Sequence, residues 1–289
     1  MLNLNKVGRP LCRIECGEYN GQVVSVSDNL TSSKQGEEAD SLIKEFKQLR
    51  IANESSFQQV PDTTKEREIL YITGPSGSGK STYTRKFLDQ YKKKFKDRPI
   101  YLFSSLPSDE SLDKIKPKRV RLDASIHTDP IDVEELKDSV CTFDDIDVIA
   151  DRKIREGVYN ILNQVLEIGR HYKITCVVTN HLPTNGKDTR RILNEAHTIT
   201  YFPHSAGGKI KYMLEEYAGL DKKQIAYMKK RCSRWCTVFK NYPQVFMLQN
   251  ELGLLNIMDE DEEEPGQVQG QAKPQLSSPE AARSAGSSA

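Results

Sequence analysis

The stretch EILYITGPSGSGKST (residues 68–82) decides the fold. Its first part, Glu68–Thr73, is an apolar run that predicts a buried strand, and Ser81–Phe95 after it predicts a helix rich in Lys and Arg. Between them the residues match G-x-x-x-x-G-K-[ST] completely. Glycines in such a loop let backbone N–H groups turn toward phosphate oxygens, and the following helix directs its positive end at them. The stretch therefore predicts a phosphate-binding loop, or P-loop, for a nucleoside triphosphate.

Two side chains of this loop have predicted roles beyond backbone contact. Lys80 can reach the β- and γ-phosphate oxygens, and the Ser81 hydroxyl can ligate Mg²⁺. We therefore expect ATP and Mg²⁺ as cofactors, with Lys80 catalytic and Ser81 a metal ligand. The residues expected to bind the nucleotide are Gly74, Pro75, Ser76, Gly77, Ser78, Gly79, Lys80, Ser81 and Thr82.

A second apolar run, Val140–Phe143, ends in the adjacent carboxylates Asp144 and Asp145. A carboxylate at the end of a strand beside the P-loop strand can hold the Mg²⁺ shell, and a second one can accept a proton from water. We assign Asp144 to the metal and Asp145 to the water. The alternative is an acidic turn, since Asp147 and Asp151 follow closely.

A third apolar run, Ile174–Thr179, ends in Asn180 and His181. A polar side chain there would sit between the carboxylate strand and the γ-phosphate, where it could sense hydrolysis. We assign this role to Asn180, with His181 as second choice and loop or helix-cap hydrogen bonding as the alternative.

An arginine supplied by a neighbouring subunit can stabilise the charge that develops on the transferred phosphoryl group. Arg170 is the catalytic candidate, with Arg190 and Arg191 as alternatives, and ordinary surface arginine as the other interpretation for each.

Short apolar runs alternate with helical patterns through the middle of the chain, which predicts an α/β fold with a mostly parallel central sheet covered by helices on both faces. The further predicted strands are Ile100–Phe103, Arg119–Leu122 and Thr198–Phe202. The predicted helices are Asp132–Lys137, Asp151–His171 and Ile210–Arg231, the last broken near Gly219.

Three segments follow from this pattern. Residues 1–65 form an N-terminal extension with a hairpin (Leu11–Val26), a helix (Glu37–Leu49) and a polar connection (Ser55–Thr64). Residues 66–257 form the P-loop domain, which ends in a hairpin of Trp235–Phe239 and Gln244–Leu248. Residues 258–289 are acidic and then rich in Gly, Pro, Ser and Gln, which predicts a disordered tail.

Composition restricts the classes of protein to which the chain can belong. The chain of 289 residues is 37% hydrophobic and 29% charged, with a net charge of +1. It has no apolar run of about 18 residues and no secretory signal pattern, so we expect no membrane span and an intracellular protein. Six cysteines then indicate free thiols in a reducing compartment. A zinc site formed by Cys12, Cys16, Cys232 and Cys236 is the alternative use of four of them.

The motifs together resemble the genome-packaging ATPases of large nucleocytoplasmic DNA viruses and their relatives, within the FtsK–HerA superfamily. The segments that carry the resemblance are GPSGSGKST (74–82), CTFDDID (141–147), LEIGRHYKITCVVTNHL (166–182), RRILNEAHTITYF (190–202) and SRWCTVFKNYP (233–243). Asp145 departs from the wider superfamily, in which the second carboxylate is commonly Glu.

The resemblance implies an ATPase that pumps double-stranded DNA into a preformed capsid. It also implies a homo-oligomeric ring, capsid or portal-vertex partners, and a location in the virion or in the viral factory of the host cytoplasm. Basic clusters such as Lys92–Lys94 and Lys229–Arg231 are candidates for contact with DNA phosphates.

Three other functions fit parts of the pattern. A nucleotide or small-molecule kinase shares the P-loop, and Arg190 and Arg191 could belong to its lid. A cellular translocase of the same superfamily is the second, although it often carries a membrane segment or a DNA-reading domain. A non-catalytic scaffold switched by nucleotide is the third, and the intact Lys80, Ser81 and paired carboxylates disfavour it.

Overall fold

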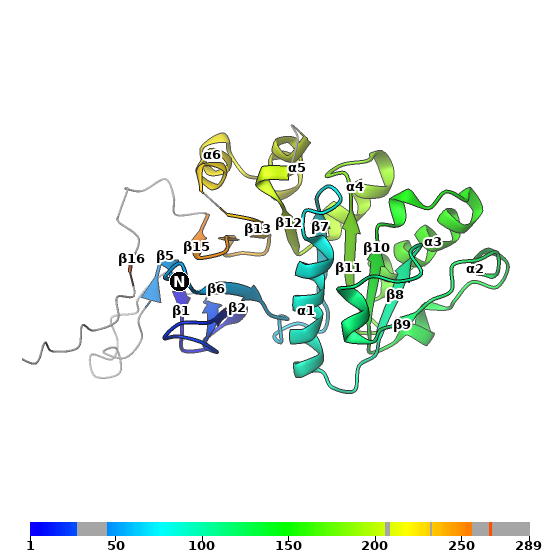
Figure 1. Ribbon diagram of the computed structural model, residues 1–289, viewed down its shortest axis with the longest axis horizontal. Helices are drawn as coiled ribbons and strands as arrows, with labels where there is room; N and C mark the ends of the chain where they lie inside the picture. Colours follow the sequence, from blue (N-terminus) through cyan, green and yellow to red (C-terminus); the bar gives the residue numbers. More distant parts are fainter. Residues whose placement is uncertain (28–44, 206–208, 232, 256–265, 268–289) are drawn as a thin grey trace, which may run out of the picture.

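The computed structural model describes residues 1–27, 45–205, 209–231, 233–255 and 266–267. They form two β-sheets, one of eleven strands and one of five. The large sheet runs through the long axis of the molecule, and the small sheet lies at its N-terminal end (Figure 1).

One half of the large sheet is parallel, in the order β12-β7-β11-β10-β8-β9. The central strands are buried along their whole length, as expected for apolar runs that helices cover on both faces. This arrangement confirms the predicted fold class. The strands are β7 (Ile69–Thr73), β8 (Ile100–Ser104), β9 (Lys118–Arg119), β10 (Val140–Asp144), β11 (Thr175–Asn180) and β12 (Thr198–Tyr201).

Helices cover the two faces of this parallel half (Figure 1). On one face α1 (Lys80–Lys94) buries Phe87 and Tyr91 against β7. On the other, α3 (Arg152–Ile168) and α4 (Gly186–Glu195) pack in the largest core cluster. The remaining helical elements are α2 (Ser125–Thr128), α5 (Lys209–Ala218), α6 (Lys222–Lys230), η2 (Leu112–Ile115), η3 (Val133–Leu136), η4 (Ile146–Val148) and η5 (Pro203–Ser205).

The other half of the large sheet is mainly antiparallel. The predicted C-terminal hairpin is confirmed by β13 (Cys236–Phe239) and β14 (Val245–Met247), and β13 joins the parallel half through β12. Three further strands extend it: β15 (Glu251–Leu254), β5 (Gln48–Arg50) and β16 (Gly266–Gln267).

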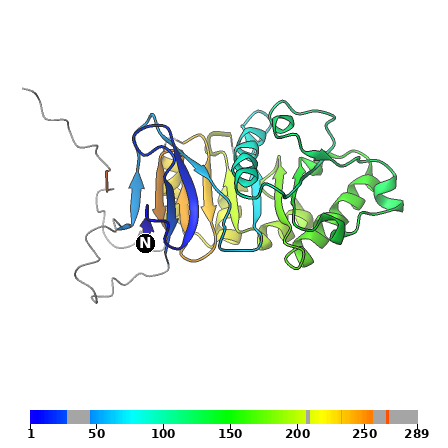
Figure 2. The same ribbon diagram turned by 90° about the horizontal axis from the view of Figure 1, so that it is seen from below.

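The N-terminal residues form the second, antiparallel sheet, in the order β4-β1-β3-β2-β6. Its side chains share one core cluster with β13, β14 and β15, so the small sheet packs on the antiparallel half of the large one (Figure 2). The strands are β1 (Leu2–Asn3), β2 (Arg9–Glu15), β3 (Val23–Val26), β4 (Glu45–Phe46) and β6 (Ser56–Gln59). The hairpin predicted over Leu11–Val26 corresponds to β2 and β3.

Two predictions for the N-terminal extension are wrong where the structure describes it. The end of the predicted helix Glu37–Leu49 is β4 and the start of β5, because Leu49 is buried opposite Leu252 while Gln48 and Arg50 lie on the other face, where both bond to Glu251. Residues 28–44 lie outside the described part. The polar connection Ser55–Thr64 contains β6, which pairs with β2; both of its glutamines are buried, and Gln59 accepts a hydrogen bond from Tyr83 of α1.

Other boundaries shift in smaller ways. The predicted strand Arg119–Leu122 is reduced to β9, and Asp132–Lys137 is a 3₁₀ turn, η3. The long helix Ile210–Arg231 is broken as expected, since Gly219 has φ +67°, a left-handed conformation that glycine adopts freely. Helix α4 was not predicted. Of the predicted tail, 258–289, only Gly266–Gln267 is described, as β16. Within the described residues no helix is long and apolar enough to cross a membrane.

Candidate active site

The P-loop connects β7 to α1 at the carboxyl edge of the parallel sheet. Gly79 has φ +110°, which a residue with a Cβ rarely adopts. Gly74 is needed for space, because an added Cβ would lie 2.9 Å from the ring of Phe202. The N–H of Gly74 donates to the carbonyl of Asn180 at 3.2 Å, which fixes the loop against β11. The sequence therefore folds here as the motif predicts.

Lys80 is buried although it carries a charge, with 5% of its surface exposed. Its Nζ donates to the carbonyl of Gly74 at 2.9 Å and lies 3.5 Å from Asp145 Oδ1. The structure thus brings together the two side chains to which the sequence assigned phosphate binding and water activation. The remaining loop residues leave room for a ligand, since Pro75, Ser76, Gly77 and Thr82 are exposed and Ser81 is half-buried in the first turn of α1.

Asp144 ends β10, but β10 does not lie directly beside the P-loop strand. β11 pairs with both and separates them, so the expectation of adjacent strands is wrong. Asp144 is 2% exposed and accepts hydrogen bonds from Thr179 Oγ1 at 2.8 Å and from Ser104 Oγ at 3.3 Å. Burial raises the pKa of Asp144, and the hydrogen bond from Thr179 opposes that rise.

Asp145 follows with φ +47°, the left-handed region, which costs a non-glycine residue roughly 1–2 kcal/mol. Consecutive strand residues point to opposite faces, and this turn breaks the alternation, so both carboxylates approach the hydroxyl of Thr179. Such strained residues concentrate at functional sites.

Thr179 contacts both carboxylates and is not among the site residues predicted from the sequence. Its hydroxyl donates to Asp144 and accepts from the N–H of Asp145 at 3.0 Å. It is fully buried between the carboxylate strand and the P-loop strand. The signal available in the sequence was its position, one residue before the end of β11 and in register with Asp144.

Asn180, the predicted sensor, lies on the opposite face of β11 from Thr179. It is fully buried, and its Nδ2 lies 3.3 Å from the hydroxyl of Tyr71. Its Oδ1 has no hydrogen-bond partner within the described residues. An amide can turn by 180° and exchange these two atoms, so Asn180 keeps one free polar atom at the end of β11.

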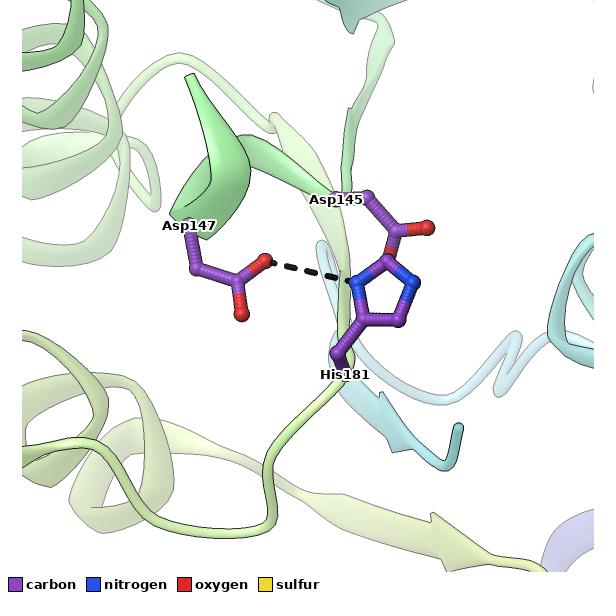
Figure 3. A group of neighbouring side chains, drawn as sticks. All are labelled: Asp145, Asp147 and His181. Atoms are coloured by element: carbon purple, nitrogen blue, oxygen red, sulfur yellow. Dashed lines mark ion pairs between the residues drawn. The ribbon is translucent and has the colours of Figure 1, made fainter. Parts of the chain in front are cut away.

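His181 lies beside the carboxylates instead. Its Nδ1 is 3.4 Å from Asp145 Oδ1 and 3.9 Å from Asp147 Oδ1 (Figure 3). Burial and the neighbouring Asp145 raise the pKa of Asp147. Asp145, Asp147 and His181 are close enough to hold a metal ion together. Mg²⁺ prefers oxygen ligands, so the predicted ligands, the Asp144 carboxylate and the Ser81 hydroxyl, suit it better than a set that includes imidazole.

Arg170, the predicted finger, is exposed and lines a cavity of about 1160 Å³ with Arg67, His171 and His197. These residues precede β7, β11 and β12, so the cavity lies at the amino edge of the sheet, opposite the P-loop of the same chain. A role for Arg170 in hydrolysis therefore requires another subunit. Of the alternatives, Arg190 is exposed on α4, and Arg191 pairs with Glu167 at 2.9 Å.

The cysteines do not form the alternative zinc site within the part of the chain that the structure describes. Cys12 and Cys236 are buried, Cys16 is exposed, and none of them belongs to a group that could hold a metal. Cys232 lies outside the described residues. Burial raises the pKa of Cys236 to about 12.

Solved structures similar to this one include two nucleotide-bound proteins. The genome-packaging NTPase B204 of Sulfolobus turreted icosahedral virus 2, in complex with AMP, is 12% identical with a TM-score of 0.42 over 61% of this chain and 94% of its own. The conjugation coupling protein TcpA of pCW3, with ATPγS, is 13% identical with a TM-score of 0.42 over 85% of this chain and 77% of its own.

A comparison with models of known protein families gives no match. Among curated proteins, the uncharacterized protein V3 of Sputnik virophage is 39% identical over 252 residues, which cover 86% of this chain and 96% of V3. Identity at this level over almost the whole of both chains shows common descent and a common fold. The chain, a protein with the P-loop NTPase fold, therefore belongs to the same family as protein V3 of Sputnik virophage.

Proposed function

We propose that this protein hydrolyses ATP and uses the energy to move double-stranded DNA. The proposal of hydrolysis rests on one observation: Lys80 Nζ, in a complete P-loop, lies 3.5 Å from Asp145 Oδ1. A phosphate-binding lysine and a carboxylate within one ion-pair distance can hold the γ-phosphate and orient an attacking water at the same place.

Each residue then has one task. Lys80 and the backbone N–H groups of the P-loop hold the phosphates. Asp145 orients water and accepts its proton, and Thr179 holds both carboxylates in position through the hydrogen bonds described above. Ser81 and Asp144 would hold Mg²⁺, which neutralises phosphate charge when it is bound.

Asn180 would report loss of the γ-phosphate through the strand that it ends. Arg170 of a neighbouring subunit would stabilise charge in the transition state. This arrangement needs a second subunit, because Arg170 lies at the edge of the sheet opposite the P-loop of its own chain, and a homo-oligomeric ring would supply one at every site.

The motifs shared with viral packaging ATPases and the kinship with a virophage protein support packaging of a viral genome into a preformed capsid as the biological task. Double-stranded DNA and capsid or portal-vertex proteins are the partners that this proposal implies. The virion or the viral factory of the host cell is the implied location.

A triplex-displacement assay tests the movement of DNA. A motor that travels along a duplex strips a labelled third strand from it when ATP is supplied. We expect displacement by the wild-type protein with ATP and none with a non-hydrolysable analogue or with Lys80→Ala. Efficient ATP turnover on the same duplex without displacement would contradict translocation and leave the assignment of hydrolysis standing.

A further inference from the structure

A small cavity of about 160 Å³ adjoins the P-loop on the side away from the carboxylates. The P-loop follows β7, whose neighbour on one side is β11 and on the other β12. Asp144 and Asp145 lie beyond β11, whereas the cavity is bordered by Phe202, at the end of β12, and by Trp235, just before β13. The two features thus lie on opposite sides of the phosphate loop.

This placement suits a nucleotide whose phosphates lie on the P-loop. If the γ-phosphate faces Asp145 and the phosphate chain follows the P-loop, the nucleoside leaves the loop near Gly79 and Thr82, and both residues line the cavity. Pockets for whole drug-sized ligands occupy roughly 300–1000 Å³. A cavity of about 160 Å³ is therefore suited to one part of the nucleotide, such as its base.

Aromatic and cationic groups form its walls. The indole of Trp235 packs edge-on against Tyr83, with ring centroids 5.1 Å apart. The guanidinium of Arg234 lies 3.9 Å from the position that a Cβ on Gly79 would occupy, and Arg234 is exposed. Within the described residues Arg234 makes no hydrogen bond or ion pair. A planar cation and a partly buried aromatic ring that line one cavity offer surfaces on which a nucleobase can stack.

The N-terminal sheet completes the cavity. Ser56 and Gln58 of β6 line it together with Gln249, and the N–H of Phe57 donates to the carbonyl of Gln249 at 2.7 Å. Lys86 of α1 pairs with Glu15 of β2 at 3.0 Å, which holds this sheet against the P-loop helix. Polar side chains at the rim can bond to the edge of a base.

We propose that this cavity binds the purine base of the nucleotide, held by Trp235 and Arg234, so that the N-terminal sheet forms part of the nucleotide site. The inference rests on the proposed function for the identity of the ligand.

Trp235 is the only tryptophan of the chain, so its fluorescence reports on this cavity alone. We expect ATP to change Trp235 fluorescence in a saturable way, and inorganic tripolyphosphate, which fills the P-loop without a base, to leave it unchanged. Arg234→Ala should weaken ATP binding about tenfold, through lost stacking, and leave the affinity for tripolyphosphate unaltered. Arg121→Ala is the matched control, because Arg121 is an exposed arginine that does not line this cavity.

Two outcomes would overturn the inference. Saturating ATP that competes with tripolyphosphate but leaves Trp235 fluorescence unchanged would place the base elsewhere. Equal losses of ATP and tripolyphosphate affinity in Arg234→Ala would assign Arg234 to the phosphates. Failure of the proposed ATPase activity would give a different result. Trp235 fluorescence would still respond to ATP, but no ATP would be hydrolysed, so the base site would stand without the activity.

Discussion

The hydroxyl of Thr179 donates to Asp144 at 2.8 Å and accepts from the backbone N–H of Asp145 at 3.0 Å. One side chain therefore sets the position of both carboxylates. Because β11 separates the P-loop strand from β10, the residue that links them has to come from β11, and Thr179 is that residue on the face shared with Asp144.

Thr179→Val tests this link. The substitution keeps the shape of the side chain and removes a hydrogen bond to a charged group, which contributes roughly 1.5–3 kcal/mol. We expect ATP turnover to fall about tenfold or more, with Thr179→Ser close to wild type because it keeps the hydroxyl. Unchanged steady-state turnover in Thr179→Val would show that the carboxylates need no such support.

Asp145→Asn separates binding from hydrolysis. The amide keeps the size of the side chain but accepts no proton from water, so we expect ATP binding to persist and turnover to fall about 10²–10⁴-fold. Lys80→Ala should instead lose binding. Equilibrium binding and single-turnover hydrolysis measure the two effects. Near-normal turnover in Asp145→Asn would move the role of general base to another group, with Asp147 and His181 the nearest candidates.

The sequence predicts those parts of the site whose interactions are local in the chain, and it misses those that join residues distant in sequence. The P-loop and the parallel strands are local patterns, and the structure has them within a few residues of the predicted bounds. Thr179 could not be chosen over Asn180 without knowing which face of β11 meets the P-loop helix. The strands β5 and β6 were missed because their partners, β15 and β2, lie far away in the sequence and bury Leu49 and Gln59 there.

Glu68 gives a pH dependence of stability. It is 5% exposed, and burial raises its pKa from 4.5 to about 8, although the N–H of Asp62 donates to it at 2.8 Å. Between about pH 4.5 and 8, Glu68 therefore keeps its proton in the folded state and has lost it in the unfolded state. Its contribution to the free energy of unfolding is greatest below this window and is lost as the pH rises through it.

Urea unfolding from pH 5 to 9 checks this dependence. We expect the midpoint to fall with rising pH in the wild type and to fall less steeply in Glu68→Gln, which carries no proton to lose. Parallel curves for the two proteins would contradict the assignment of the dependence to Glu68.

Tyr83 joins the P-loop helix to both sheets. Its buried hydroxyl donates to Gln59 Oε1 at 2.8 Å and lies 2.7 Å from Thr237 Oγ1. Tyr83→Phe leaves the buried Gln59 Oε1 without its donor, while Thr237 keeps its contact with Thr200, and we expect a cost of roughly 1–3 kcal/mol in the free energy of unfolding. Tyr242→Phe, at a tyrosine that is 57% exposed, should change it little. Urea titration of both variants measures the difference. Equal stabilities would show that the hydroxyl of Tyr83 does not contribute to the free energy of unfolding.

ATP hydrolysis by the purified protein, measured with and without long double-stranded DNA, tests whether the protein is a DNA motor. We expect turnover that rises with DNA, weakens steeply as salt screens the phosphate contacts, and vanishes in Lys80→Ala. Turnover that depends on Lys80 but is indifferent to DNA and rises with a small phosphate acceptor would contradict the motor and identify a kinase.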